Sequence, residues 1–554
     1  MPTADILITN ASILTMDKAR PRAGSLAIAG NRIIALGEPG DLTAFKARHT
    51  RVIDAAGKTV MPGIVEGHVH LFIGAVENES LMLNGAQGFE PIARAVKDYR
   101  AKNPGQAVIT ATGVAHESFG PATPITRQLL DRIVPDVPFI TVCFDLHTVW
   151  ANTRALETAG LIKGRELPTG NEIVMGVDGL ATGELRESAA FMPALGLTPT
   201  GGREWLGMTT GENPVPPATP AQRAIDENFM KKGMALAAAL GITSMHNMDG
   251  NWYQLELLKT LLDNGELNAR IEVPFHQKNF FELSRVDEAF DMRAQYQGEM
   301  LHCDRVKIFI DGVLESLTAL MLDDYPGHPG NQGAPLFTAE EFNALAQRID
   351  ARQMQISVHA IGDGGVRRTL DSYELARRKN GPRDSRHRIE HIELIDPTDI
   401  PRLKELGVVA SLQPIAGVGV PGNPHEPILS RVGDKLPNAY AWQTLRETGA
   451  EIAFSSDWPV APLNPFLGMQ AAMTAVPLKP GCRDQSQTLM DTLDGFTTAG
   501  AYMEFMEDRK GMLREGYLAD VVVLDSDLEK TPKDRIATVR PLTTICDGRV
   551  TFEA

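Results

Sequence analysis

The central part of the chain alternates short apolar runs with longer amphipathic stretches. Apolar runs of strand length recur between residues 60 and 456, and segments between them, such as DENFMKKGMALAAAL, carry apolar residues at helical spacing. This alternation predicts repeated βα units around a parallel sheet, and eight units close most simply into a (β/α)8 TIM barrel. The strand candidates are 60–70, 242–247, 270–276, 305–310, 354–359, 386–391, 408–413 and 452–456.

The two ends of the chain have a different pattern. Short alternating runs broken by Gly and Asn, such as SLAIAGNRIIALG near the start and TVRPLTTICDGRVTF near the end, predict antiparallel strands. Neither piece has enough apolar surface to fold alone. We therefore expect the two termini to pair into one composite β-sandwich.

A long interval, residues 71–241, separates the first strand candidate from the second. It is too long for a structureless loop in a compact domain and indicates an insertion domain after the first barrel strand. The expected organisation is an α/β chain with the first part of the sandwich at 1–60 and its second part at 508–554. The barrel occupies 61–507, with the insertion at 75–240.

The chain is acidic, with 54 Lys and Arg against 70 Asp and Glu, a net charge of −16. This charge disfavours nucleic acids and anionic membranes as partners, so we expect a small-molecule substrate. The four cysteines lie far apart without C-x-x-C spacing, and no secretory signal is evident. A cytoplasmic location follows as the simplest expectation, and homo-oligomerisation is left open.

Ionisable residues stand at the ends of several strand candidates. His68 and His70 end the first one, and their i, i+2 spacing directs both imidazoles to the same face. Later candidates carry Lys307, His359, His391 and Asp457. Because the C-terminal ends of barrel strands meet at one mouth, these residues are expected to converge. Four imidazoles, one carboxylate and one lysine predict a site for two metal ions.

The order of these residues, with the motifs around them, resembles the amidohydrolase superfamily. The motifs are similar to those of its amidohydrolase-3 branch, which includes N-substituted formamide deformylases. They are PGIVEGHVH, VKIFIDGVL, VHAIGDGG and GMLREGYLADVVVLDSD, with HTVWANTRAL and GVDGLATGELRESA inside the insertion. The resemblance covers nearly the whole chain. It implies a metal-dependent hydrolase that cleaves a non-peptide C–N bond of the amide or formamide type.

Carried over residue by residue, the resemblance implies two divalent metal ions, with zinc as the default. His68, His70 and Asp457 would bind the more buried ion, and His359 and His391 the second. Lys307 would bridge both ions as a carboxylated lysine, because an ammonium group cannot be a ligand of a cation.

The implied mechanism is attack of a metal-bound hydroxide on a polarised carbonyl. Asp457 would take the proton of the hydroxide and pass it to the departing nitrogen.

Two departures from the family pattern matter here. Glu66 stands where the family usually has Asp, and Asp311 and Glu315 are alternative bridging carboxylates, or salt-bridge partners of Lys307, if it is not carboxylated.

Other residues are candidates for supporting roles. Asp363 and Glu390 could orient metal-binding imidazoles, although capping and salt-bridge roles are equally consistent with their positions. The candidate substrate-binding residues are His116, His147, Trp150 and Trp458; each could instead be a locally bonded or core residue.

Two alternatives to amide hydrolysis remain open at this stage. The same site could hydrolyse an ester, a carbamate or a cyclic imide. A non-catalytic binding or regulatory protein on the same barrel is the second alternative, and the complete set of six ligand candidates argues against it.

Overall fold

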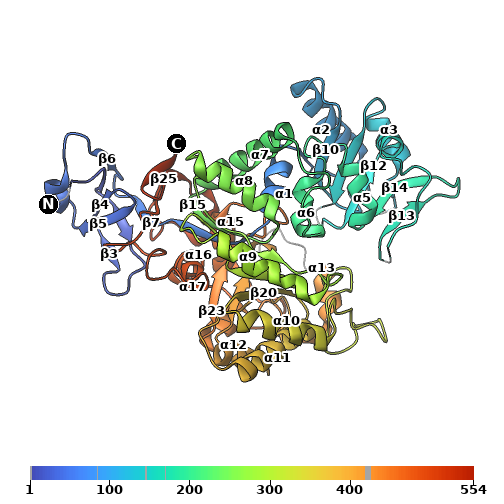
Figure 1. Ribbon diagram of the computed structural model, residues 1–554. Helices are drawn as coiled ribbons and strands as arrows, with labels where there is room; N and C mark the ends of the chain where they lie inside the picture. The colour runs from blue at the N-terminus through green and yellow to red at the C-terminus, as the bar shows by residue number, and fades with distance from the viewer. Residues whose placement is uncertain (1–2, 84, 121, 144–145, 169, 418–425) are drawn as a thin grey trace. The chain divides into compact units, whose positions relative to one another are not determined.

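The computed structural model describes residues 3–554 except 84, 121, 144–145, 169 and 418–425 (Figure 1). The chain forms two compact units. The first consists of Met1–His70 with Met234–Ala554, and the second is Leu71–Gly233.

The centre of the first unit is built from parallel strands in two sheets, of order β18-β16-β15-β8 and β17-β19-β20-β21-β22-β23. Nearly every residue in them is buried on both faces, as expected for parallel sheets covered by helices. The strands are β8 (Ile64–Val69), β15 (Ile242–Asn247), β16 (Arg270–Glu272), β17 (Phe275–His276), β18 (Leu301–His302), β19 (Arg305–Phe309), β20 (Gln355–Ala360), β21 (Arg388–His391), β22 (Val409–Leu412) and β23 (Glu451–Phe454).

The two parallel sheets are connected at both sides. Strands β16 and β17 follow each other in the chain and are interrupted at Val273–Pro274, where proline cannot donate a backbone hydrogen bond. On the other side, the backbone nitrogen of Asp457, just after β23, donates to the carbonyl of His68 at 2.9 Å. Val69 and Trp458 form a parallel bridge beside it. The segment after the last strand therefore lies against the first strand.

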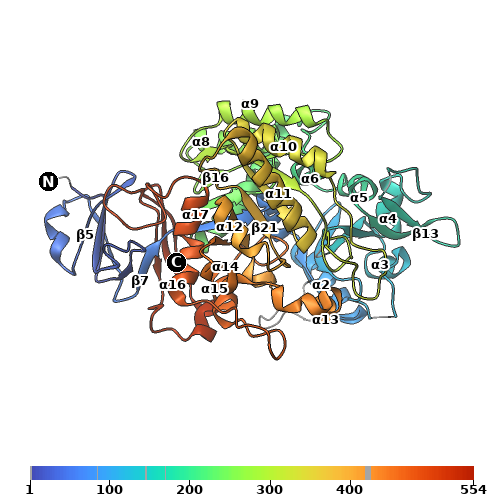
Figure 2. The same cartoon turned by 90° about the horizontal axis from the view of Figure 1, so that it is seen from below.

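Helices follow most of these strands. In Figure 2, α10, α11 and α12 lie together beside β21, and both α10 and α11 pack on β20. A capping box of Thr338 and Glu341 starts α10, and α11 ends before Gly381, whose φ is 91°. The helices are α8 (Trp252–Asp263), α9 (Asp287–Gln295), α10 (Ala339–Ala351), α11 (Asp363–Asn380), α12 (Ile400–Leu406), α13 (Glu426–Val432), α14 (Trp442–Glu447), α15 (Pro465–Thr474), α16 (Leu489–Phe496) and α17 (Thr498–Met503).

Two further sheets of the first unit contain the strands of the chain ends, and the second of them combines strands from both ends. One has the order β5-β4-β1-β6, and the other β26-β25-β24-β7-β2-β3. Their apolar faces share one core of residues such as Ile8, Leu26, Val521 and Ile545. The strands are β1 (Ile6–Thr9), β2 (Ser12–Leu14), β3 (Arg22–Ala23), β4 (Ser25–Ala29), β5 (Arg32–Gly37), β6 (Arg51–Asp54), β7 (Thr59–Pro62), β24 (Val521–Leu524), β25 (Pro541–Cys546) and β26 (Arg549–Glu553).

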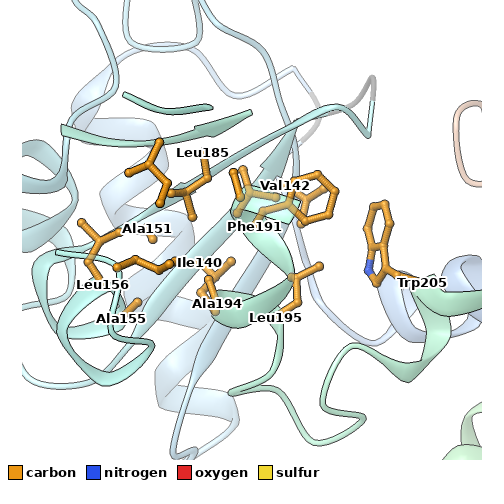
Figure 3. Packing of buried hydrophobic residues seen from close by; sticks show 14 of the residues in the cluster. Ile140, Val142, Ala151, Ala155, Leu156, Leu185, Phe191, Ala194, Leu195 and Trp205 are labelled. Atoms are coloured by element: carbon orange, nitrogen blue, oxygen red, sulfur yellow. The ribbon is translucent and has the colours of Figure 1, made fainter. Parts of the chain in front are cut away.

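The second unit has its own mixed sheet, of order β13-β14-β12-β11-β10-β9, and its own core. Figure 3 shows Ile140, Val142 and Leu185 of the sheet packed against Phe191 and Leu195 of α5. The strands are β9 (Leu81–Met82), β10 (Ile109–Val114), β11 (Phe139–Cys143), β12 (Thr148–Ala151), β13 (Glu172–Met175) and β14 (Ala181–Arg186). The helices are α1 (Leu71–Asn78), α2 (Phe89–Lys102), α3 (Arg127–Ile133), α4 (Thr153–Thr158), α5 (Ser188–Leu195), α6 (Arg203–Thr209) and most of α7 (Pro220–Ala239).

Each of the eight strand candidates contains a parallel strand, and 270–276 contains two short ones because of Pro274. The mixed α/β class with parallel sheets is confirmed. Strand β18 was not predicted, since two residues leave no periodic signal. Within the described ranges, no helix is both long and apolar enough to span a bilayer.

Candidate metal centre

Three of the six ligand candidates lie within contact of one another. His68 is the second-to-last residue of β8, His70 follows that strand directly, and Asp457 comes three residues after β23. The Nε2 atoms of both histidines lie 3.3 Å from Oδ1 of Asp457. One ligand atom from each of the three residues fits within 4.8 Å of the others, which is the spacing of a metal site.

The far side of each of these imidazoles is held by a carboxylate. Nδ1 of His68 lies 2.8 Å from Oε2 of Glu390, and Nδ1 of His70 lies 2.6 Å from Oδ1 of Asp249. A carboxylate accepts, so Nδ1 carries the proton in both rings. In the neutral rings the Nε2 lone pairs then face Asp457, and three electron-rich atoms converge. A divalent cation fits this donor set, and the carboxylate–histidine pairs are typical supports of metal ligands.

Two more imidazoles continue the group. The ring of His391, at the end of β21, is centred 4.9 Å from that of His68, and the ring of His359, in β20, is 4.6 Å from His391. Nδ1 of His391 donates to Oε1 of Gln413 at 2.8 Å, which leaves Nε2 as its donor atom. Nε2 of His359 donates to the carbonyl of Gly312 at 3.1 Å, which leaves Nδ1.

Lys307 lies on β19, beside β20, and is fully buried. Its Nζ has no hydrogen-bond partner among the residues that the structure describes. Burial lowers the pKa of Lys307 to about 8, against the attraction of Glu390 and Asp457. A buried, unpaired amine is costly, and a lowered pKa gives this amine a neutral fraction that can react with carbon dioxide.

The charge states of the site follow from burial and from these partners. Burial, followed by the charge of Lys307, lowers the pKa of His68 to about 3. Burial also acts to lower the pKa of His70, but Asp249 and Asp457 raise it to about 9. Burial raises the pKa of Glu66 to about 8, although its Oε1 accepts from the backbone nitrogen of Ser456 at 2.8 Å. Because its raised pKa leaves the His70 imidazole protonated at neutral pH, a cation that binds at this site must displace a proton from His70.

The backbone is strained where the ligand candidates project from it. His391 has a φ of 77°, Ile392 of 48° and Asp457 of 62°. Such values are uncommon for residues other than glycine, and unfavourable for the β-branched Ile392. Outliers of this kind concentrate at functional sites, where surrounding structure holds them in place.

The structure does not favour the alternative roles of the nearby acids. Asp311 accepts hydrogen bonds from the backbone nitrogens of Leu320, Ile361 and Gly362, and Glu315 is exposed. Among the described contacts, Asp311 forms no ion pair with Lys307. Asp363, the first residue of α11, accepts from the backbone nitrogens of Gly364 and Leu322 and pairs with Lys435 at 2.6 Å, which fits a salt-bridge role rather than orientation of an imidazole.

The four candidate substrate-binding residues have local roles in the structure. Trp150 is 1% exposed within the core of the second unit, and His116 packs edge-on against its ring at 4.9 Å. His147, also in the second unit, is exposed and pairs with Glu187 at 3.0 Å. Trp458 is buried beside His70, whose backbone nitrogen donates to its carbonyl at 2.8 Å. A substrate role for each remains a prediction.

Asp249 and Gln413 are the supporting residues that sequence reasoning missed. Asp249 stands two positions after β15, and Gln413 directly after β22, so both are polar residues at strand ends like the ligands themselves. That position was the available signal. His246, which precedes Asp249, instead points into a buried cluster with Arg305 and Arg388.

Known proteins resemble this chain over almost its entire length. LONG AFTER FAR-RED 3 of Arabidopsis thaliana is 28% identical, with 97% of this chain and 90% of the relative covered. N-substituted formamide deformylase of Arthrobacter pascens is 24% identical, with 99% and 98% covered. The solved structure of a metal-dependent hydrolase from Pyrococcus horikoshii OT3 has a TM-score of 0.74 at 23% identity, covering 95% of this chain and 99% of that one.

A family model described as the amidohydrolase family matches residues 51–552, which include all six ligand candidates. This match confirms the family expected from the sequence motifs. The chain belongs to the amidohydrolase family and is a hydrolase acting on carbon–nitrogen bonds other than peptide bonds.

Proposed function

We propose that the chain hydrolyses an amide- or formamide-type bond of a small molecule at a site for two divalent cations, with zinc as the first candidate. The observation that carries the proposal is the convergence of His68, His70 and Asp457. Both Nδ1 atoms are already bonded to carboxylates, so the lone pairs are directed at one point. His359 and His391 would hold the second cation, and carboxylated Lys307 would bridge the two.

The fold supports this arrangement through its strand order. We propose that the two parallel sheets, joined at Val273–Pro274 and at the Val69–Trp458 bridge, form one (β/α)8 barrel. The domain limits are proposed as 1–60 and 508–554 for the sandwich, and 61–507 for the barrel with its insertion at 75–240.

Bound cations would lower the pKa of water and polarise the substrate carbonyl. Asp457 is suited to move the proton, because its side chain is 13% exposed whereas Glu390 is fully buried. Burial acts to raise the pKa of Asp457, but the neighbouring histidines, with His68 first, hold it well below its usual range. The carboxylate is therefore ionised at neutral pH, can accept a proton from water, and can deliver it to the departing nitrogen.

The substrate class is proposed from the relatives. N-substituted formamide deformylase, named for C–N cleavage, covers 99% of this chain. An ester, a carbamate or a cyclic imide presents the same polarised carbonyl, so the assay must include each class.

The test begins with elemental analysis of protein purified without chelator, followed by hydrolysis of N-formyl and N-acyl amines with matched esters and cyclic imides. We expect nearly two metal ions per chain, turnover of the amides, and loss of turnover on chelation. Lys307→Ala should bind fewer ions and lose activity, and bicarbonate should not restore it. Near-zero metal that zinc with bicarbonate does not restore would refute the proposal.

A further inference from the structure

A fully buried arginine ties together the strands that carry the proposed metal ligands. The guanidinium of Arg388, on β21, donates to the carbonyl of Gly67 in β8 at 2.8 Å and to Oγ of Ser411 in β22 at 3.1 Å. It also donates to Nδ1 of His246 in β15 at 2.8 Å. Four strands thus meet at one planar group with five N–H donors.

The guanidinium of Arg388 also contacts the carboxylate of Glu390, which in turn contacts the imidazole of His68. Nε and one NH2 group of Arg388 lie 2.9 and 3.1 Å from the two oxygens of Glu390. The hydroxyl of Ser357 donates to Oε1 of Glu390 at 2.6 Å, and Oε2 faces Nδ1 of His68 at 2.8 Å. The carboxylate is therefore held from three sides, and its orientation determines the orientation of the imidazole.

The position of Arg388 is fixed in turn by His246. Nδ1 of His246 accepts from Arg388 and from Arg305 at 3.1 Å, so this nitrogen cannot carry a proton. Its Nε2 then carries the proton and faces Glu504 at 3.5 Å. Arg305 pairs with Glu272 at 2.7 Å. A neutral imidazole between two guanidinium groups anchors both of them in the buried cluster.

We infer that Arg388 is a positioning residue for the metal centre, acting on His68 through Glu390 and through the carbonyl of Gly67. The inference rests on the proposed metal site. It goes beyond that proposal because the described hydrogen bonds and ion pairs of Arg388 include no ligand side chain, and Arg388 reaches His68 through Oε2 of Glu390, the oxygen that also faces Nδ1 of His68. Lysine cannot replace it, since an ammonium group has three donors and no planar fork.

The test compares Arg388→Lys with Arg270→Lys. Arg270 is a matched control, because it is 1% exposed and pairs with Asp520 at 2.8 and 3.1 Å in the same unit. None of its described contacts involves a proposed ligand. Cobalt affinity is measured by chelator competition, ligand geometry by the visible spectrum of bound cobalt, and stability by thermal unfolding.

We expect Arg388→Lys to bind cobalt about tenfold more weakly and to change its spectrum, in line with other supporting partners of metal ligands. Arg270→Lys should lower the unfolding temperature while its cobalt affinity stays within about twofold. An unchanged Arg388→Lys variant, or equal weakening by Arg270→Lys, would overturn the inference while the metal site stands. A parent protein that binds no cobalt would overturn the proposed function as well.

If Arg388→Lys does not fold, Ser411→Ala serves instead. It removes one of the acceptors of Arg388 and leaves a small, buried void next to β21. We expect a shifted cobalt spectrum with a few-fold loss of affinity. An unchanged spectrum and affinity in this variant would overturn the inference.

Discussion

Replacement of Asp249 tests how the site holds His70. The Asp249 carboxylate is fully buried and lies 2.6 Å from Nδ1 of His70. In Asp249→Ala, the imidazole can move its proton to Nε2, which removes the lone pair that faces Asp457. Loss of such a partner typically weakens metal binding 10- to 100-fold, or about 1.4–2.7 kcal/mol. Leaving a buried N–H unpaired costs about 1–3 kcal/mol, a similar amount.

The assay is zinc affinity by chelator competition at pH 7.5, for the parent, Asp249→Ala and Asp249→Asn. The asparagine keeps an oxygen that can accept from Nδ1 but loses the charge, so its affinity should fall between the other two. Asp520→Asn, which disturbs the buried pair with Arg270, is the control and should leave the affinity unchanged. Parent-like zinc binding by Asp249→Ala would refute the role of this carboxylate.

Three further predictions concern the second unit. Trp150→Ala should lower the free energy of unfolding by about 3–5 kcal/mol, because Trp150 is 1% exposed in a hydrophobic core. Chemical denaturation measures this free energy, and a variant with a changed KM but unchanged stability would contradict the prediction. Burial raises the pKa of Glu204 to about 7 from 4.5, because the folded protein favours the protonated carboxyl group. The contribution of this group to the free energy of unfolding is therefore complete below about pH 4.5 and is lost as the pH rises through 7. Glu204→Gln should therefore stabilise the protein at pH 8 relative to the parent, by up to about 3 kcal/mol, and flatten its pH profile of unfolding; parallel profiles would contradict the assignment. His147→Ala should change stability by less than about 1 kcal/mol in the same measurement, because its pair with Glu187 is exposed, and a larger loss would show that the pair is structural.

The ligand candidates could be found from the sequence because each lies within a predicted strand or shortly after one. Lys307 and His359 stand in short, nearly continuous apolar runs, where an ionisable residue is costly without a function. Parallel pairing then brings the candidates close together, since His359 pairs with Glu390, the residue directly before His391. Local pattern and parallel strand order were sufficient to select His68, His70 and Asp457, which the structure brings together, and their role as metal ligands stays a prediction.

The supporting contacts could not be predicted in the same way. Asp249 and Gln413 reach their histidines through the path of the loops that follow β15 and β22, and no periodicity encodes such a path. Trp150 is a different case. Its sequence motif made it a candidate for substrate contact, but tertiary packing buries its ring in a hydrophobic core. His246 needed the identities of two arginines from distant strands before its tautomer could be assigned.

The contact between the first strand and the segment after the last one has a consequence for the order of events during synthesis. His68 and His70 emerge early, but Asp457 and Ser456, which bonds to Glu66 across 390 positions, emerge late. A nascent chain can form the strands near its start and still lack the third ligand. With the ligands proposed above, tight binding of a cation requires the final strand to be in place, so metal uptake would distinguish a completely folded chain from a partly folded one.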